Sequence, residues 1–184
     1  MLHFAMQLAD VLIEQFADQH YGGFYFTAND HEDLIQRPKV SSDEATPSGN
    51  GIAAMSLLKL GLLLSRNDYI QAAEGTLDYA SKAMLDSPMA HGSLLSCLQN
   101  LELTPRVIII RGERTSIDQW RQQCQVDFNP QHLVFAIPND SDNLPEALAA
   151  KCAQHSEPLA YICEGFSCQA PINDLQQLKQ QLSA

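Results

Sequence analysis

The pattern of hydrophobic residues changes at Thr104-Pro105, and this change constrains the fold more than any other feature of the chain. Before it, apolar residues recur every three or four positions, as they do in amphipathic helices. After it, short runs rich in β-branched residues alternate with helical patterns, which favours a parallel sheet with right-handed crossovers. The three strands are predicted at 106–111, 132–137 and 159–163.

The fold class that follows is α+β. Residues 1–103 are predicted to form helical hairpins with a long loop at 22–50, and residues 104–184 a small three-stranded, mainly parallel α/β unit. Within the first part, apolar stripes predict helices at 2–17, 51–64, 69–84 and 94–101.

The second helix needs to be buried over more of its surface than the other three. Pro47 suits its first turn, with Thr46 or Ser48 as its cap. The helix carries only Ser56 and Lys59 as polar side chains, so it must be buried on nearly every side. Either the α/β unit covers it, or the chain is a piece of something larger, which is the favoured explanation. An uncovered apolar surface predicts self-association.

Charge excludes two classes of partner. The formal net charge is −11, from 11 basic and 22 acidic residues. Nucleic acid phosphates and anionic membrane surfaces both need clustered Lys and Arg, so we expect neither as a partner. The N-terminus lacks the basic region of a signal peptide, and the apolar segment 51–64 is too short to span a bilayer. A cytoplasmic location is therefore expected.

The five cysteines form an odd and scattered set. Without C-x2-C or H-E-x-x-H spacing, we expect no metal site and no cofactor. Reduced thiols are the default in a cytosolic protein. Cys163 and Cys168 flank Gly165, and if the glycine bends the chain their thiols could form a redox pair. The alternative is that both are buried as small hydrophobic residues.

The connection at 22–50 is long for a compact domain, and such loops are usually functional or disordered. Its aromatic residues argue against disorder. If residues 24–26 are extended, Phe24 and Phe26 share one face and Tyr25 takes the other. The rings could line a ligand cleft. The favoured alternative is that the two Phe side chains anchor the loop while Tyr25 alone faces the cavity.

The turn before the second helix contains further candidate site residues. It would present free backbone N–H groups at a helix N-terminus together with Asp43, Ser48 and Asn50. With Arg37 and Lys39 close in sequence, this turn could hold an anionic or hydroxyl-rich ligand. The alternative is that the serine and asparagine cap the helix while the carboxylate balances its dipole.

Asp30 and Asp43 are the candidate catalytic carboxylates. Sugar hydrolysis needs two carboxylates on opposite sides of the scissile bond, and epimerisation needs a base. No spacing in the loop fixes such a geometry, so the catalytic residues stay open.

Several motifs occur in one order along the chain: G-G-F-Y-F-T at 22–27 and Asp30, then R-P-K at 37–39 and D-x-A-x-P-S-G-N at 43–50, and finally Y-I-C-E-G-F-x-C-x-A-P at 161–171. Together they resemble the C-terminal end of the spermatogenesis-associated thioredoxin-like family and its bacterial relatives. The resemblance covers essentially the whole chain.

Members of that family look like a thioredoxin-like domain followed by an α/α toroid, which is similar to N-acylglucosamine 2-epimerases and six-hairpin glycosidases. The resemblance implies that residues 1–103 are the last hairpins of an incomplete toroid, whose funnel the loop 22–50 would line. It implies carbohydrate chemistry for the parent protein, whereas the isolated chain is not expected to be a competent enzyme. The alternative is a non-catalytic interaction or redox-accessory module. The residues expected to hold a small polar, sugar-like ligand are Tyr25, Arg37, Lys39, Asp43, Ser48 and Asn50.

Overall fold

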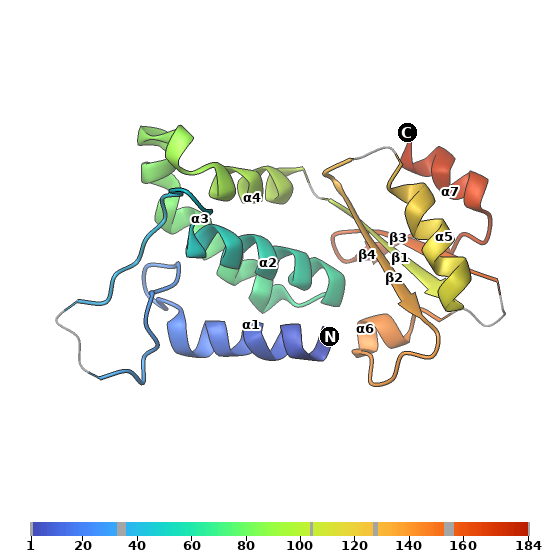
Figure 1. The fold of residues 1–184 in the computed structure, drawn as a ribbon, viewed down its shortest axis with the longest axis horizontal. Helices are drawn as coiled ribbons and strands as arrows, with labels where there is room; N and C mark the ends of the chain where they lie inside the picture. The colour runs from blue at the N-terminus through green and yellow to red at the C-terminus, as the bar shows by residue number, and fades with distance from the viewer. Residues whose placement is uncertain (1, 33–35, 104, 127–128, 153–156, 184) are drawn as a thin grey trace. The chain divides into compact units, whose positions relative to one another are not determined.

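The computed structural model describes residues 2–32, 36–103, 105–126, 129–152 and 157–183. Loop residues 33–35 and the predicted boundary residue Thr104 lie outside these ranges. The chain divides into two compact units, Met1–Glu102 and Leu103–Ala184, which are a helical unit and an α/β unit (Figure 1). The predicted α+β class is confirmed.

The helical unit follows the predicted apolar stripes. Helix α2 packs against both α3 and α4, and α1 lies along α2 (Figure 1). No helix in the described part of the chain is both long and apolar enough to cross a membrane. The elements are α1 (Leu2–Phe16), α2 (Gly49–Leu64), α3 (Asn67–Asp86), the short 3-10 helix η1 (Pro88–Ala90) and α4 (Gly92–Glu102).

Both ends of α2 have local causes. Ser48 is the N-cap, and its Oγ accepts a hydrogen bond from the Gly51 N–H at 3.0 Å. The helix begins at Gly49, so the prediction that Pro47 occupies the first turn is wrong. Pro47 instead precedes the N-cap. The capping residue, Ser48, is extended, and this lets its hydroxyl reach back to the first turn of the helix. The helix ends at Leu64, and its C-cap, Ser65, adopts a left-handed conformation with φ of 55°.

The chain reverses direction directly after α1 through a tight glycine turn. The Asp18 N–H donates to the Gly23 carbonyl at 2.9 Å, and the Gly22 N–H donates to the Asp18 carbonyl at 3.0 Å. Both glycines have φ of 72°, which L side chains rarely adopt. A Cβ on Gly22 would lie 2.0 Å from the carbonyl oxygen of Gly75 in α3. The backbone of the turn therefore packs directly against the backbone of α3.

The α/β unit contains, among its described residues, a four-stranded sheet in the order β2-β1-β3-β4. Strand β1 (Arg106–Gly112) pairs in parallel with β2 (His132–Pro138) and antiparallel with β3 (Leu159–Glu164). Strand β4 (Ser167–Cys168) pairs antiparallel with β3. The positions of the three predicted strands are confirmed. The prediction of a three-stranded, mainly parallel sheet is wrong, because a short fourth strand is present and two of the pairings are antiparallel.

The two connections between the strands differ in the length of their helices. Between β1 and β2, helix α5 (Arg114–Cys124) returns the chain along the sheet, as a parallel crossover requires. Between β2 and β3, helix α6 (Glu146–Ala149) has only four residues. It rises about 6 Å, against about 23 Å for a seven-residue strand. The helix alone cannot return the chain along the sheet, and β3 starts near the edge where β2 ends and runs in the opposite direction.

The two faces of the sheet are covered differently. On one face, α5 and α7 (Leu175–Leu182) pack over a core that includes Ile108, Ile162 and Trp120. Helix α6 belongs to the other face, where the Leu148 carbonyl accepts a hydrogen bond from Arg111 Nη1 at 3.0 Å. Strand β4, in the hairpin that contains the two cysteines, is an edge strand of this sheet (Figure 1).

We expect Gly22→Ala to destabilise the helical unit by about 1 to 3 kcal/mol, because alanine would be strained at positive φ and would collide with the α3 backbone. Gly75→Ala is the matched control. Its Cβ would meet Gly22 Cα at an ordinary 3.8 Å, and alanine favours the helix by up to about 1 kcal/mol. Urea unfolding followed by circular dichroism measures both. Equal stability losses would contradict this account of the turn.

Candidate functional site

A buried carboxylate, Asp18, organises the first part of the loop. It lies two residues after the end of α1, and its Oδ2 accepts hydrogen bonds from Tyr25 Oη at 2.7 Å and from Lys39 Nζ at 2.8 Å. Its Oδ1 accepts from the backbone N–H groups of His20 and Tyr21, both at 3.0 Å. A carboxylate offers about four acceptor positions, so Asp18 has none left for a ligand.

Lys39 joins this carboxylate to the glycine turn and to α3. Its ammonium donates a second hydrogen bond to the Gly22 carbonyl at 2.8 Å and lies 3.9 Å from the centre of the Tyr79 ring. The Tyr79 hydroxyl in turn donates to the Lys39 carbonyl at 2.8 Å. Only 11% of the Lys39 side chain and 6% of the Asp18 side chain are exposed, so this ion pair is buried.

Arg37, in the second half of the loop, contacts Tyr25 and Thr27 in the first half. Its guanidinium stacks 4.2 Å from the centre of the Tyr25 ring, and Nη2 donates to the Thr27 carbonyl at 2.6 Å. Tyr25 is thus held between Asp18 at its hydroxyl and a cation over its ring. The predicted ligand residues Tyr25, Arg37 and Lys39 are brought together. Tyr25 and Lys39 use their polar groups within the chain, whereas Arg37 bonds through Nη2 and its buried Nε has no hydrogen-bond partner among the described residues.

The charges of this cluster are fixed by its contacts. The hydrogen bond from Lys39 is the largest cause that holds the pKa of Asp18 well below its usual range, and it outweighs the effect of burial. The hydrogen bond to Asp18, followed by burial, raises the pKa of Tyr25. At neutral pH the carboxylate is therefore ionised and the phenol keeps its proton. This pair offers no ready general base.

Asn50 ties the two arms of the loop to the first turn of α2. Its Oδ1 accepts from the Phe24 N–H at 2.7 Å, and its Nδ2 donates to the carbonyls of Phe24 at 3.0 Å and Val40 at 2.8 Å. The side chain is buried and uses both ends of its amide. These backbone groups of the irregular loop do not pair with one another, and the Asn50 side chain is their hydrogen-bond partner instead.

Asp43 bridges the N-termini of two helices. Its Oδ1 accepts from the Ser48 N–H at 2.8 Å and from Ser93 Oγ at 2.5 Å, and its Oδ2 accepts from the Ser93 N–H at 2.8 Å. Burial alone would raise the pKa of Asp43, but the hydrogen bonds from Ser93 and Ser48 outweigh it and lower the pKa to about 2. Asp43 and Ser48 therefore meet at the start of α2, as predicted, and serve there as caps.

The other candidate residues of the loop differ in exposure. Asp30 is exposed, and no hydrogen bond or ion pair within the described ranges links it to Asp43. Phe24 is buried, whereas Phe26 is 80% exposed. The prediction that both phenylalanines anchor the loop is therefore wrong for Phe26, because the backbone turns after Tyr25 instead of continuing as a strand.

Sequence reasoning missed three residues on which this arrangement depends: Asp18, Tyr79 and Ser93. Asp18 had a local signal, since an acidic residue beside a Gly-Gly turn often bonds the turn's own N–H groups. Tyr79 and Ser93 had none, because each is 40 or more residues from its partner in the chain.

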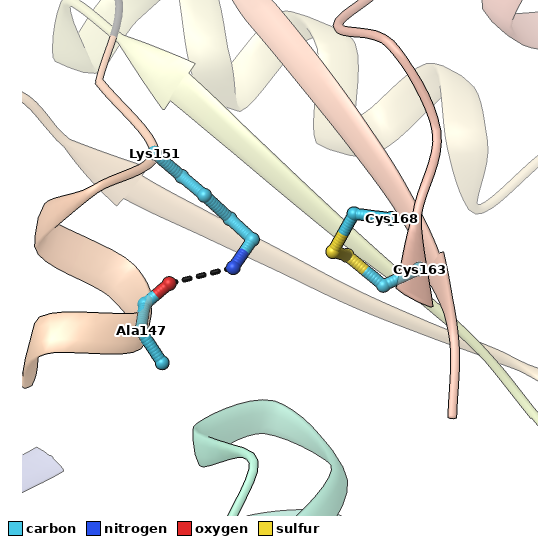
Figure 2. The surroundings of a disulfide bond; sticks show 4 residues. All are labelled: Ala147, Lys151, Cys163 and Cys168. Carbon is cyan, nitrogen blue, oxygen red and sulfur yellow. Dashed lines mark hydrogen bonds between the residues drawn. A yellow bond between two sulfur atoms is a disulfide. The ribbon is translucent and has the colours of Figure 1, made fainter. Parts of the chain in front are cut away.

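Cys163 and Cys168 are joined by a disulfide across the hairpin of β3 and β4 (Figure 2). Gly165 has φ of 57° and bends the chain between them, which is the condition on which a redox pair depended. The alternative of two buried cysteines fails for Cys168, which is exposed. Cys97, Cys124 and Cys152 are free, so the default of reduced thiols holds for these three alone. No cluster of His, Cys, Asp or Glu that could hold a metal ion occurs in the described part of the chain.

Known proteins give distant matches only. No protein-family model matches the chain. Human spermatogenesis-associated protein 20 is 28% identical over 188 residues, which cover 98% of this chain and 24% of that protein. The rat protein of the same name is 28% identical over 195 residues, with the same coverage. The uncharacterized protein B0495.5 of Caenorhabditis elegans is 24% identical over 161 residues, which cover 86% of this chain and 22% of that protein.

The similarity extends over nearly the whole chain, and the chain spans about a quarter of the length of the curated relatives it matches. The resemblance that the motifs indicated is thus confirmed as a distant relationship to spermatogenesis-associated protein 20. The names of these relatives state no activity, and the toroid and sugar chemistry stay predictions.

We expect Lys39→Met to destabilise the helical unit by about 3 to 5 kcal/mol, because it leaves the buried Asp18 carboxylate without its cation. The control is the double variant Asp18→Asn/Lys39→Met, which removes both charges and should recover much of that loss. The pKa of Asp18 lies below its ordinary value of about 3.9. Its stabilising effect is therefore complete above that pH and is lost as the pH falls below it.

Unfolding free energies from pH 7 down to pH 2 test both statements. The double variant should lose less stability on acidification than the native chain. A single variant as stable as the native chain would show that the ion pair does not hold the loop.

Proposed function

We propose that this chain is a non-catalytic binding module whose helical unit docks an α-helix of a larger helical assembly in the groove between α1 and α2. The observation that carries this proposal is the groove itself, an apolar cleft of about 410 Å³. That volume lies within the range of ordinary binding pockets. Its lining includes Ala5, Leu8, Ala9 and Leu12 of α1 and Ile52, Ser56 and Leu60 of α2.

The spacing of the lining residues favours a helix as the occupant. On both walls they recur every three or four positions, which makes the ridges and grooves that a third helix packs into. Small residues such as Ala5, Ala9 and Ser56 would let its backbone come close. Leu8 and Ile52, one from each wall of the groove, are 54% and 53% exposed. Such contiguous apolar exposure tends to mark a contact surface.

The state of the polar residues supports a binding role over catalysis. The acceptor positions of Asp18 are filled, and Asp43 is occupied by two helix N-termini. A catalytic carboxylate needs a free oxygen within reach of its substrate.

The comparisons support a larger assembly as the context. The matched relatives are about four times as long as the segment they share with this chain. In this proposal, further helical hairpins of such a protein would occupy the groove, and an α/α toroid is the architecture that the motifs favour. A second copy of this chain would take their place when the chain is studied by itself.

We expect the isolated chain to self-associate at tens of micromolar and to bind an apolar dye such as anilinonaphthalene sulfonate. Ile52→Glu should abolish both by placing a charge in the groove. Leu85→Glu is the matched control, since Leu85 is 83% exposed on α3 and does not line the groove. Light scattering and dye fluorescence measure the two effects. A monomer that binds no dye, or equal effects of the two variants, would defeat the proposal.

A second candidate is the predicted sugar-like ligand of the loop, favoured by Tyr21 and Phe26, which are 79% and 80% exposed beside the Asp18 cluster. Exposed rings can stack on sugars. We expect millimolar monosaccharides or sugar phosphates to raise the melting temperature, and Tyr21→Ala/Phe26→Ala to remove the shift. Phe4→Ala, at another exposed ring, should keep it. No shift with any sugar would refute this candidate and leave the groove proposal intact.

A further inference from the structure

The hairpin of β3 and β4 places two sulfur atoms side by side at the edge of the sheet. Gly165 and Phe166 form its two-residue turn, and Cys163 is directly opposite Cys168 in the register. Their sulfur atoms are bonded (Figure 2). This disulfide belongs to the α/β unit and has no part in the groove of the helical unit.

The hairpin has other means of holding its shape. Gly165 supplies the left-handed turn, and the Gln169 N–H donates to the Ile162 carbonyl at 2.9 Å. Ala160 and Ile172 exchange two backbone hydrogen bonds, each 2.9 Å long, further along the same edge. The loop closed by the disulfide is also very short, and the entropic benefit of a crosslink grows with loop length. The disulfide is therefore not required to keep the strands paired.

The two sulfur-bearing residues differ in access. Cys168 is exposed, whereas Cys163 is only 5% exposed. Lys151, which follows α6, belongs to the surroundings of the disulfide, and its side chain extends in the direction of the sulfur atoms (Figure 2). Its ammonium donates to the Ala147 carbonyl at 2.6 Å, and no ion pair of Lys151 occurs among the described residues. A cation without a carboxylate partner is available to a thiolate.

We propose that this hairpin is a thiol–disulfide exchange site that accepts two electrons from an accessible dithiol. A thiolate of the donor attacks the exposed Cys168 sulfur, and the bond between the two sulfurs breaks. The electron pair leaves on Cys163, in the direction of which the Lys151 side chain extends (Figure 2), and that sulfur then takes up a proton. The second donor thiolate attacks the donor sulfur of the mixed disulfide and releases Cys168, which is also protonated. The donor ends as a disulfide and this chain as a dithiol.

The exposed side chain at the tip of the hairpin indicates where a donor would make contact. Phe166 is 61% exposed in the turn, directly beside the strand that carries Cys168. A donor with an apolar surface next to its own thiols fits this arrangement. The redox chemistry of the hairpin is independent of whether α1 and α2 dock a helix.

The test uses the full chain with Cys152→Ser, because Cys152 is an exposed free thiol that would also react. The protein is equilibrated without denaturant in graded mixtures of reduced and oxidised dithiothreitol, alkylated, and analysed by mass spectrometry. We expect Cys163 and Cys168 to gain two alkyl groups together and reversibly, with the thermal unfolding transition retained. Resistance to reduction until the protein unfolds, loss of folding on reduction, or failure to form the bond in oxidised buffer would each overturn the proposal.

Variants of Lys151 and of the two cysteines test the direction of attack. Lys151→Gln should slow reduction about threefold or more, whereas Lys151→Arg should keep the rate, because it keeps a positive charge in the surroundings of the disulfide. In Cys163→Ser, the remaining Cys168 should form a mixed disulfide with oxidised glutathione faster than Cys163 does in Cys168→Ser. Equal rates for the two lysine variants would overturn the role of Lys151. If a cysteine variant fails to fold, the titration of the native pair still decides the proposal.

Discussion

The buried ion pair between Lys39 and Asp18 is the interaction on which the helical unit depends. It joins three segments that are far apart in the sequence: the turn after α1, the returning arm of the loop, and α3 through Tyr79. Removing two charges from water is costly, and the cost is offset only where both partners are fully hydrogen-bonded. Asp18 meets this condition with four donors, and the lysine adds the Gly22 carbonyl and an aromatic ring.

The same physics explains how a long polar loop can be ordered without regular secondary structure. Its backbone groups still need partners, and side chains provide them where no strand or helix does. Asn50 pairs with the backbone on both arms of the loop, and Asp43 accepts from the N-termini of α2 and α4. Binding sites use these residue types for the same reason, since amides and carboxylates pair well with polar groups. Their composition alone therefore does not separate a ligand site from an internal scaffold.

The two units offer different chemistry to partners. The helical unit presents an apolar groove whose walls have helical spacing. The α/β unit presents a disulfide with one accessible sulfur and an exposed aromatic residue at the tip of its hairpin. The two proposals both place this chain in contact with other polypeptides. Its distant relatives are about four times as long as the segment that matches this chain. The proposed roles need no catalytic carboxylate.

The elements that depend on local contacts could be predicted from the sequence. Apolar periodicity located the helices, β-branched runs located three strands, and Ser48 was a candidate cap because capping acts within one turn. The glycine between Cys163 and Cys168 likewise indicated that their sulfurs could meet. Tertiary structure alone decided which residues met over long distances. Tyr79 and Ser93 bond to loop residues that are 40 or more positions away in the sequence. Strand β3 runs antiparallel to β1, whereas β2 runs parallel to it. Periodicity records which face of an element is buried, but not which distant partner covers it or which way the next strand runs.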